Sequence, residues 1–496
     1  MAVRLLPWVL FLLAAVLRFI LPAARPLHHD EGSNFIFLLR LIEEGTWRYD
    51  PVNYHGPVLY QIGALPLRLW GTGEATLRLV PALLGSLMAP LVWGLRDRIG
   101  RAGAAGAGLL IAISPCFVFY SRFQIHEIYL AFFSLCLALA LSRALGAFAP
   151  GRTGPRPGAC VAAGAAAGAM LATKETALAS LGAIGLAGVV WAVGSGARPR
   201  VRDLGAALLA ALCVTVILYT DFLRNPGALA AIPEGLLAWG GRGLGGEGHD
   251  KPWWYFVVLL AREEPWALAG GTLGVIVAAV RREPFPIGLG VWFVLILGAY
   301  SAVPYKTPWL VLNPLLPLLL MTGSVVDGVR RSPPAARRAL AAALVLVVPW
   351  AMARAYDLAI RRPDVEGASG LVYVQTDRDL LRMIDRIEHH AADLPEGLDV
   401  PIAILSPDYL PLNWYLRDFR AVAYWGRPVD NLDAPILIVR EDQAEAIGNG
   451  PARGFDRSVW RLRPGVRLVL FLRPPPADAA TEPRTGGALV PADQPD

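Results

Sequence analysis

Long apolar segments separated by short polar connections make up residues 1–357. Eleven of these segments approach or reach the roughly 17–25 residues that a helix needs to cross a bilayer. Helices are expected, because backbone groups in hydrocarbon must be satisfied within the segment. The first segment is longer than the apolar core of a cleaved signal peptide and is expected to remain as an anchor. The predicted spans are 5–23, 79–95, 104–119, 128–147, 158–173, 176–193, 204–220, 265–280, 286–303, 309–326 and 339–357.

The long connection between the first two spans, residues 24–78, has structure of its own. Apolar residues recur at helical spacing within 31–45 and 57–70. Both segments are predicted to be helices that lie in the membrane interface rather than cross it. The segment 252–256, rich in Trp and Tyr, is also expected at the headgroup level.

Apolar runs shorten to strand length after about residue 358. Strands are expected at 371–374, 402–405, 436–439 and 467–472, with helices at 378–389 and 441–447 between them. This alternation predicts a small α/β domain over residues 358–473. Residues 474–496 are rich in Pro, Ala, Gly and Asp and are predicted to form a disordered tail.

Composition supports the membrane class. The chain is 55% hydrophobic and 17% charged, with a mean hydropathy of +0.46, whereas a soluble protein carries about a quarter charged residues. The net charge of +6 does not indicate nucleic-acid binding, because the arginines form short clusters between apolar segments. Neither a disulfide nor a zinc cluster is expected, since all four cysteines lie in predicted spans and none has paired spacing: Cys116, Cys136, Cys160 and Cys213.

Every second connection is rich in arginine, namely 96–101, 152–156, 198–202, 281–282 and 330–338. The positive-inside rule places these connections and the N-terminus in the cytoplasm. The other connections and the C-terminal domain are then extracytoplasmic, and the chain is expected in the inner membrane. The three lysines of the chain, Lys174, Lys251 and Lys306, all fall on the outer face. Lysine ends in a compact ammonium group, and the placement of all three lysines on this face indicates selection for that group. Chance placement of three residues is the alternative.

The strongest chemical signal is His28-His29-Asp30-Glu31, directly after the first span. Adjacent carboxylates at a membrane surface are costly to dehydrate and mark functional sites. Such a carboxylate can take a proton from an acceptor hydroxyl or bind a cation with help from the histidines. The alternative is a solvated helix start, where acidic residues are favoured.

Aromatic and proline residues follow in the same loop. Tyr54, His55 and Tyr60 surround a Gly-Pro turn, and their rings would line whatever the turn encloses. Sugar rings pack well on such faces, so these residues are candidates for substrate binding. Turn chemistry with interfacial tyrosines explains the pattern equally well.

Two short outer connections carry further charged residues. Arg122, His126 and Glu127 lie between closely spaced spans, where Glu127 could approach Asp30. An ordinary Arg–Glu ion pair closing the hairpin is the alternative. Lys174-Glu175 is a candidate for substrate binding too, although the two could simply neutralise each other.

Lys306 lies beside Tyr305 and between two prolines, Pro304 and Pro308. A cation in fixed geometry neutralises phosphate charge and helps a phosphate leaving group. We therefore expect Lys306 to meet an anionic headgroup.

In combination, these motifs resemble the GT-C superfamily of membrane glycosyltransferases. Within it, they resemble the bacterial and archaeal branch near protein mannosyltransferases and aminoarabinose transferases, a branch similar to glycosyltransferase family 39. The resemblance covers most of the membrane region and rests on His29-Asp30-Glu31, Tyr49-Asp50-Pro51, His55-Gly56-Pro57, Ser121-Arg122-Phe123 with Glu127, Ala172-Thr173-Lys174-Glu175 and Tyr305-Lys306-Thr307-Pro308-Trp309.

The resemblance implies a GT-C-like fold and inverting transfer of a sugar from a polyprenyl-phosphate donor to an acceptor outside the cytoplasm. The acceptor would be a protein, lipid or glycan of the cell envelope. Asp30 would be the base, with Glu31 and Glu127 shaping the site. Some relatives hold a divalent metal with such carboxylates, here Asp30 and Glu127, and others do not. Candidate substrate-binding residues are His29, Tyr54, His55, Tyr60, Arg122, His126, Lys174, Glu175, Lys251, Tyr305 and Lys306.

A transporter or flippase-associated protein for polyprenyl-linked glycans is the alternative. Transporters place ionisable residues at mid-membrane and show repeated halves. Few ionisable residues lie deep in the predicted spans and no internal repeat is evident. The sequence therefore favours the enzyme.

Overall fold

The computed structural model describes residues 2–147, 157–243, 245, 249–429 and 432–474. The chain forms two compact units, of which the first ends at Gln375 and the second begins at Thr376. The predicted disordered tail, from residue 475 on, and the arginine-rich connection 152–156 lie outside the described residues.

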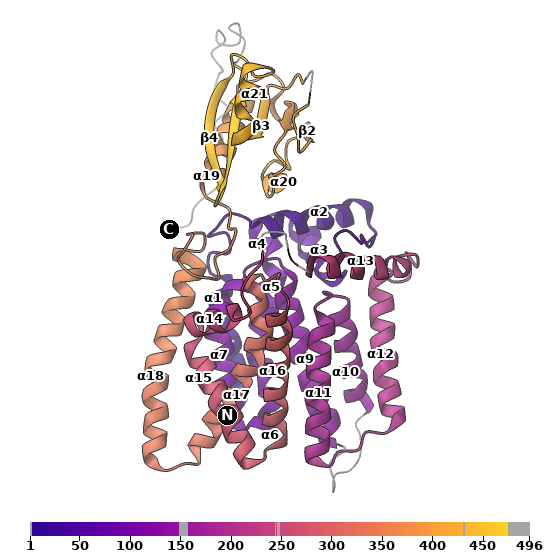
Figure 1. Ribbon diagram of the computed structural model, residues 1–496, viewed down its shortest axis with the longest axis vertical. Coiled ribbons are helices and arrows are strands. Elements are labelled where there is room, and N and C mark those ends of the chain that lie inside the picture. The colour runs from indigo at the N-terminus through magenta and orange to yellow at the C-terminus, as the bar shows by residue number, and fades with distance from the viewer. Residues whose placement is uncertain (1, 148–156, 244, 246–248, 430–431, 475–496) are drawn as a thin grey trace. The chain divides into compact units, whose positions relative to one another are not determined.

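The first unit is a bundle of apolar helices (Figure 1). Among the described residues, seven helical segments are long and apolar enough to cross a membrane, and four shorter apolar helices accompany them. The N-terminal half comprises α1 (Ala2–Phe19), α4 (Glu74–Leu77), α5 (Leu79–Leu91), η1 (Val92–Leu95), α6 (Arg96–Ile99), α7 (Arg101–Ile113), α8 (Pro115–Tyr120), α9 (His126–Ala147), α10 (Pro157–Leu171), α11 (Ala177–Ser195) and α12 (Val201–Tyr219). The C-terminal half comprises α14 (Tyr255–Glu263), α15 (Pro265–Arg281), α16 (Pro284–Ala302), η2 (Pro308–Val311), α17 (Leu312–Arg330), α18 (Pro334–Tyr356) and η3 (Asp357–Arg361).

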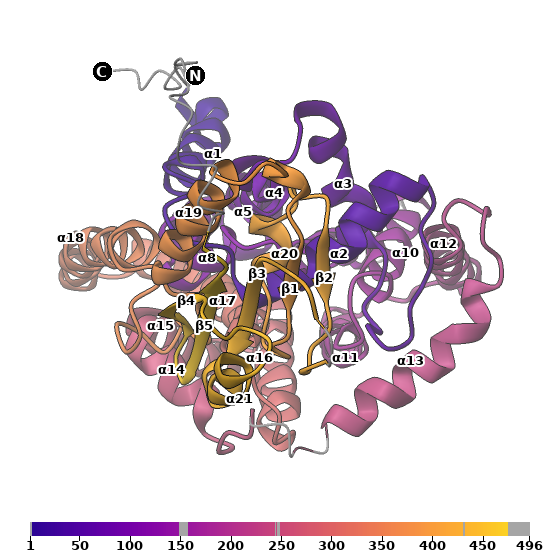
Figure 2. The same cartoon turned by 90° about the horizontal axis from the view of Figure 1, so that it is seen from above.

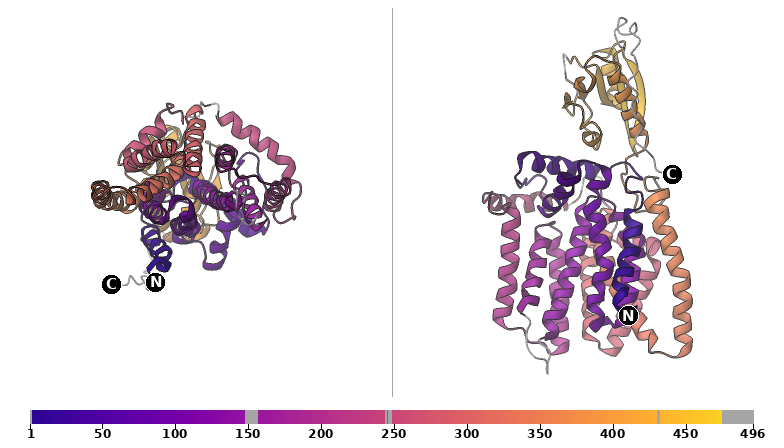
Figure 3. Two further views of the ribbon diagram at one scale, coloured as in Figure 1. Left: turned by 90° about the horizontal axis from the view of Figure 1, so that it is seen from below. Right: turned by 180° about the vertical axis from the view of Figure 1, so that it is seen from behind.

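Small residues allow close approach at the centre of the bundle. A Cβ atom added at Gly323 of α17 would lie 2.5 Å from the carbonyl oxygen of Gly103 of α7. Such contacts are typical of helix pairs in membranes, where packing replaces the hydrophobic effect. By contrast, α12 and α18 stand at opposite edges of the bundle (Figures 1–3) and bury only 6% and 11% of their most apolar windows. Their exposed apolar surfaces are the ones that lipid would cover.

Three further helices lie across one end of the bundle, namely α2 (His29–Glu44), α3 (Val58–Trp70) and α13 (Ala228–Gly243) (Figure 1). The sequence predicted α2 and α3 as helices but did not predict α13. A break at Ser114 also divides the predicted span 104–119 into α7 and α8, because Ser114 caps α8 and Pro115 begins it.

The second unit contains a five-stranded mixed sheet in the order β2-β1-β3-β5-β4. Its strands are β1 (Ile402–Ile404), β2 (Val422–Tyr424), β3 (Ile436–Arg440), β4 (Asp456–Arg463) and β5 (Val466–Leu472). β1 is parallel to β2 and β3, whereas β5 is antiparallel to β3 and β4. The other elements are α19 (Asp379–Ala392), η4 (Gly397–Asp399), α20 (Leu412–Tyr415), η5 (Glu441–Gln443) and α21 (Ala444–Asn449).

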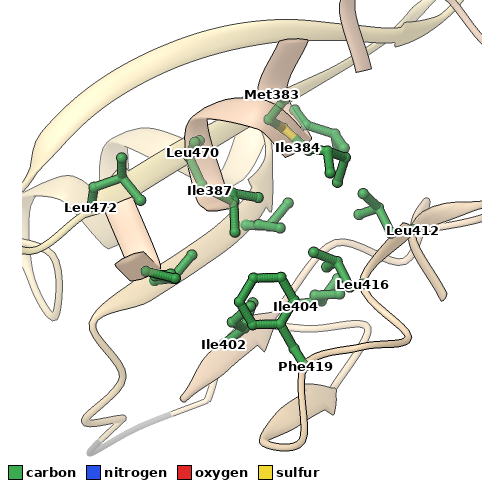
Figure 4. Packing of buried hydrophobic residues seen from close by; sticks show 14 of the residues in the cluster. Met383, Ile384, Ile387, Ile402, Ile404, Leu412, Leu416, Phe419, Leu470 and Leu472 are labelled. Carbon is green, nitrogen blue, oxygen red and sulfur yellow. The ribbon is translucent and has the colours of Figure 1, made fainter. Parts of the chain in front are cut away.

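Strand alternation divides the core of this unit between the two faces of the sheet. Ile402 and Ile404 pack with α19 and α20 (Figure 4), whereas Leu437 and Val439 pack with α21. The alternation follows from the two-residue period of a strand. The small α/β architecture agrees with the sequence prediction. The strand expected at 371–374 is wrong, because these residues form a turn, a bend and irregular backbone and belong to no strand of the sheet.

Candidate active site

The N-terminus of α2 holds the acidic pair at the centre of the predicted site. His28 is the N-cap, and its Nδ1 accepts a hydrogen bond from the backbone N–H of Asp30 at 3.1 Å. In return, Oε2 of Glu31 accepts from the backbone N–H of His28 at 2.9 Å. This capping box places Asp30 and Glu31 in the first turn, where carboxylates are stabilised by the helix dipole.

Glu31 is completely buried and serves as the hub of a hydrogen-bond network. It accepts from Arg25 at 2.9 Å, from Arg78 at 2.8 and 2.9 Å, and from the backbone N–H of Gln124 at 3.1 Å. Burial disfavours the charged carboxylate, but the two arginines outweigh burial and hold the pKa of Glu31 well below its ordinary value. A carboxylate engaged in this way is a poor base, so its geometry fits a scaffolding role.

Asp30, one position earlier, is half-buried, and within the described residues its carboxylate has no hydrogen bond or ion pair. Its charge helps to raise the pKa values of two phenols, those of Tyr305 and Tyr373, after the larger effect of burial. For Tyr305 the pKa rises to about 12, so this hydroxyl stays protonated at neutral pH. Asp30 therefore combines an available carboxylate with nearby proton donors.

Glu127, at the start of α9, forms a buried ion pair with Lys174, which precedes α11. Burial alone would lower the pKa of Lys174, but Glu127 and Glu175 reverse this effect and raise it. Lys174 is therefore firmly cationic. The structure pairs it with Glu127 rather than with its sequence neighbour Glu175.

Glu175 instead accepts a hydrogen bond from the ring of His55, with 3.0 Å between Oε2 and Nδ1. The ring of His55 lies 4.4 Å from that of His126. Two buried atoms of this group, Oε1 of Glu175 and Nε2 of His126, have no hydrogen-bond partner in the described structure. These two atoms of the cluster are thus available to form hydrogen bonds with a ligand.

Aromatic residues border this cluster. Nη1 of Arg242, on α13, donates to the hydroxyl of Tyr54 at 2.9 Å, and the guanidinium lies 5.0 Å from the centroid of the same ring. Tyr60 is buried, where its hydroxyl donates to Asn34 at 3.0 Å and accepts from Asn53 at 2.9 Å. The sequence did not predict Arg242 as a site residue, because no motif distinguishes it from the other arginines of the chain.

Arg122 has a different environment from the predicted one. Its guanidinium donates to carbonyl oxygens at the C-terminal end of α1, including those of Arg18 at 3.1 Å and Ile20 at 2.7 Å. Arg18 in turn donates to the carbonyls of Ile111 and Ala112 at the end of α7. Both arginines therefore cap helix C-termini, which carry partial negative charge.

Lys306 is also buried, with 1% of its surface exposed. Its ammonium donates to the carbonyl oxygens of Val303 and of Lys251, the latter at 3.1 Å. The ammonium therefore joins the segment 249–251 to 303–306, which also meet through an isolated bridge between Asp250 and Tyr305. Lys251 is less buried, and its ammonium lies 5.4 Å from the ring centroid of Tyr373.

Of the predicted charged residues, Asp30 raises the pKa of Tyr305 and Lys174 lowers it, both after the larger effect of burial. His29 is the first residue of α2. Across the described ranges, no group of three or more His, Cys, Asp or Glu side chains is placed to hold a metal ion.

Comparison with known proteins places these features in a family context. Residues 54–220 match the family described as dolichyl-phosphate-mannose-protein mannosyltransferase. A stretch of 79 residues is 34% identical to undecaprenyl phosphate-alpha-4-amino-4-deoxy-L-arabinose arabinosyl transferase 1 of Pseudomonas fluorescens, covering 16% of this chain and 14% of that protein.

Solved structures show the likeness over nearly the whole chain. ArnT from Cupriavidus metallidurans bound to undecaprenyl phosphate is 18% identical, with a TM-score of 0.64 over 93% of this chain and 97% of that one. The oligosaccharyltransferase of Archaeoglobus fulgidus, in a complex with Zn and sulfate, is 14% identical, with a TM-score of 0.59 over 90% and 69% of the two chains. The chain has the fold of the GT-C membrane glycosyltransferases, and the resemblance that the sequence predicted is confirmed.

Proposed function

We propose that the chain is an inverting membrane glycosyltransferase. It moves a sugar from a polyprenyl-phosphate donor to a protein, lipid or glycan acceptor on the extracytoplasmic side. Two likenesses support the proposal, namely the family match over residues 54–220 and the fold shared with an ArnT structure that binds undecaprenyl phosphate.

One observation carries the assignment of the base. Among the three candidate carboxylates, Glu31 is occupied by Arg25 and Arg78, and Glu127 is occupied by Lys174. Asp30 is half-buried and, across the residues that the structure describes, its carboxylate forms no hydrogen bond or ion pair. A general base must be able to approach the proton it takes. Asp30 meets this requirement, and Glu31 fixes the helix turn on which it sits.

The transfer step is a single displacement. Asp30 accepts the proton of the acceptor hydroxyl as its oxygen attacks the anomeric carbon of the donor. The bond between that carbon and the phosphate oxygen breaks, and polyprenyl phosphate leaves with the electron pair. Positioning and charge stabilisation supply most of the acceleration in such a step.

Cations around Tyr305 would stabilise the phosphate. Arg242 and Lys251 are candidates because they are exposed or partly exposed, and Lys174 because the donor phosphate could share it with Glu127. Lys306 and Arg122, which donate to backbone carbonyls, act instead by holding the surrounding segments. A divalent ion bound by Asp30 and Glu127 would have to displace Lys174.

The membrane topology is part of the proposal. All eleven apolar helical segments would cross the inner membrane, the seven long ones and the four shorter ones alike. The arginine-rich connections would lie in the cytoplasm, whereas α2, α3, α13 and the C-terminal α/β domain would lie outside.

A transfer assay separates this function from transport. The purified chain in proteoliposomes is given a polyprenyl-phosphate donor with a radiolabelled sugar, together with protein, lipid and glycan fractions of the cell envelope. We expect label to appear in one fraction while an equal amount of polyprenyl phosphate is released. Movement of intact labelled donor across the bilayer, without release, would establish the transporter instead.

A further inference from the structure

A cavity of about 370 Å³ lies at the opposite end of the bundle from the candidate active site. Four helices connect the two places. α11 begins at the site and ends at the cavity, α16 begins at the cavity, and α15 and α17 end there. A helix of 19 residues such as α11 is roughly 28 Å long, close to the thickness of the hydrocarbon core. In the proposed topology, the cavity would therefore lie at the headgroup level of the other leaflet.

The cavity is lined by equal numbers of positively and negatively charged side chains. Its lining includes three arginines and three carboxylates, namely Arg98, Arg281, Arg331, Asp97, Glu283 and Asp327. Asp327 is bound by Arg331 at 2.6 Å. Arg281 is half-exposed, and its nearest carboxylate oxygen, on Glu283, is 4.0 Å away, at the limit of an ion pair. Arg281 can therefore accept a phosphate partner at little cost.

An apolar groove adjoins this polar cavity. The two share Trp191 and Phe285, whose rings meet edge to face with centroids 5.1 Å apart. The groove encloses only about 30 Å³, so it is a shallow apolar furrow on the surfaces of α9, α11 and α16, lined by Leu141, Gly188 and Leu289 among others. A charged cavity beside an apolar groove matches the polarity of a phospholipid, whose headgroup would fill the cavity while an acyl chain lies along the groove.

We propose that this composite site binds one phospholipid with a zwitterionic headgroup of the phosphatidylethanolamine type. Its phosphate contacts Arg281, its ammonium group contacts the cavity carboxylates, and an acyl chain occupies the groove. Basic pockets between helices commonly bind lipid headgroups. The equal number of carboxylates here favours a ligand that carries both charges over an anionic one. The proposal is independent of sugar transfer at the other end of the bundle.

Two variants block the two halves of the site. Arg281→Ala removes the phosphate contact, and Arg338→Ala removes an exposed charge from the same end of the bundle as its control. Gly188→Leu fills the groove, because a Cβ there would meet only Leu141 and Leu145 side chains at 3.9 Å. Its control is Gly185→Leu on the exposed side of α11, where a Cβ meets nothing within 4 Å.

The test is native mass spectrometry of the full-length, delipidated protein incubated with 1-palmitoyl-2-oleoyl phosphatidylethanolamine. We expect one retained lipid, a loss of retention of at least about fivefold in Arg281→Ala and in Gly188→Leu, and normal retention in both controls. Parallel samples receive phosphatidylglycerol or inorganic phosphate.

Three outcomes would overturn the proposal. One is equal retention of the lipid in all variants. Another is tighter binding of phosphatidylglycerol that Arg281→Ala and Gly188→Leu both weaken. The third is binding of inorganic phosphate that Arg281→Ala abolishes and Gly188→Leu leaves unchanged, because the site would then hold a soluble anion.

Discussion

Arg78 donates two parallel hydrogen bonds to Glu31, from Nε to Oε1 at 2.8 Å and from Nη2 to Oε2 at 2.9 Å. Both side chains are almost completely buried. The pair holds the first turn of α2 against the segment that begins α5, and Asp30 occupies the adjacent position of that turn. The most buried acid of the motif thus fixes the helix, and its neighbour remains available for chemistry.

Glu31→Gln is expected to destabilise the protein by about 3–5 kcal/mol, because it leaves Arg25 and Arg78 buried without their counter-charge. Thermal unfolding in detergent measures the change. Glu74→Gln is the matched control, since Glu74 contacts Arg78 at 3.4 Å from a more exposed position. Equal losses in the two variants would contradict the hub role of Glu31.

The same carboxylate predicts a dependence on pH. Because the pKa of Glu31 is lowered in the folded state, its contribution to stability is complete above its unfolded value of about 4.3 and is lost as pH falls below it. Between about pH 4.3 and pH 3, the wild-type protein should therefore lose stability more steeply than Glu31→Gln.

Arg122→Met is expected to lower thermal stability by at least about 2 kcal/mol, since Arg122 caps the end of α1 through several carbonyls. The Michaelis constant for the lipid donor should not change. Arg40→Met, at an exposed position of α2, is the control for stability. A raised Michaelis constant for the donor in a stable Arg122→Met protein would restore the predicted role of Arg122 in substrate binding.

Lys174 and Glu127 should show strong coupling. Each single variant, Lys174→Met or Glu127→Gln, leaves one buried charge unpaired and should destabilise the protein. The double variant removes both charges, so its loss of stability should be smaller than the sum of the two single losses. The double variant should fold yet use the lipid donor poorly, because the site has lost a cation. Additive stability losses, or a normal donor constant in the double variant, would count against this assignment.

Arg242→Gln should raise the Michaelis constant for the donor about tenfold with little effect on stability, since Arg242 is exposed beside Tyr54. Steady-state kinetics with varied donor measures this change. Arg224→Gln removes another exposed arginine from the connection that precedes α13 and should leave the constant unchanged.

The helices were predictable because the length of each apolar segment can be read directly from consecutive residues of the sequence. Each of the eleven predicted spans overlaps an apolar helical segment of the structure. α13 was missed because its glycines and Pro233 weaken the helical pattern. The strand expected at 371–374 failed for another reason: its residues contact helices of the first unit, as the hydrogen bond from Tyr120 to the carbonyl of Leu371 shows.

The sequence indicated which residue types form the site, but it did not indicate which side chains pair with one another. Asp30 and Glu31 look equivalent in sequence, and only Arg25, Arg78 and the N–H of Gln124 distinguish them. Similarly, nothing local indicates that Lys174 pairs with Glu127 while Glu175 pairs with His55. Contacts between residues 47 to 120 positions apart are set by the packing of whole helices.

The central claim is that Asp30 removes the acceptor proton, and its most direct test is the transfer rate of Asp30→Asn beside that of Asp50→Asn. Asp50 lies in the same loop, where its carboxylate accepts a local hydrogen bond from the N–H of Val52 at 2.9 Å. We expect Asp30→Asn to fold normally, to bind donor, and to lose about 10²–10⁴-fold in rate, while Asp50→Asn transfers at nearly the wild-type rate. A folded Asp30→Asn protein that transfers sugar as fast as Asp50→Asn would contradict the account.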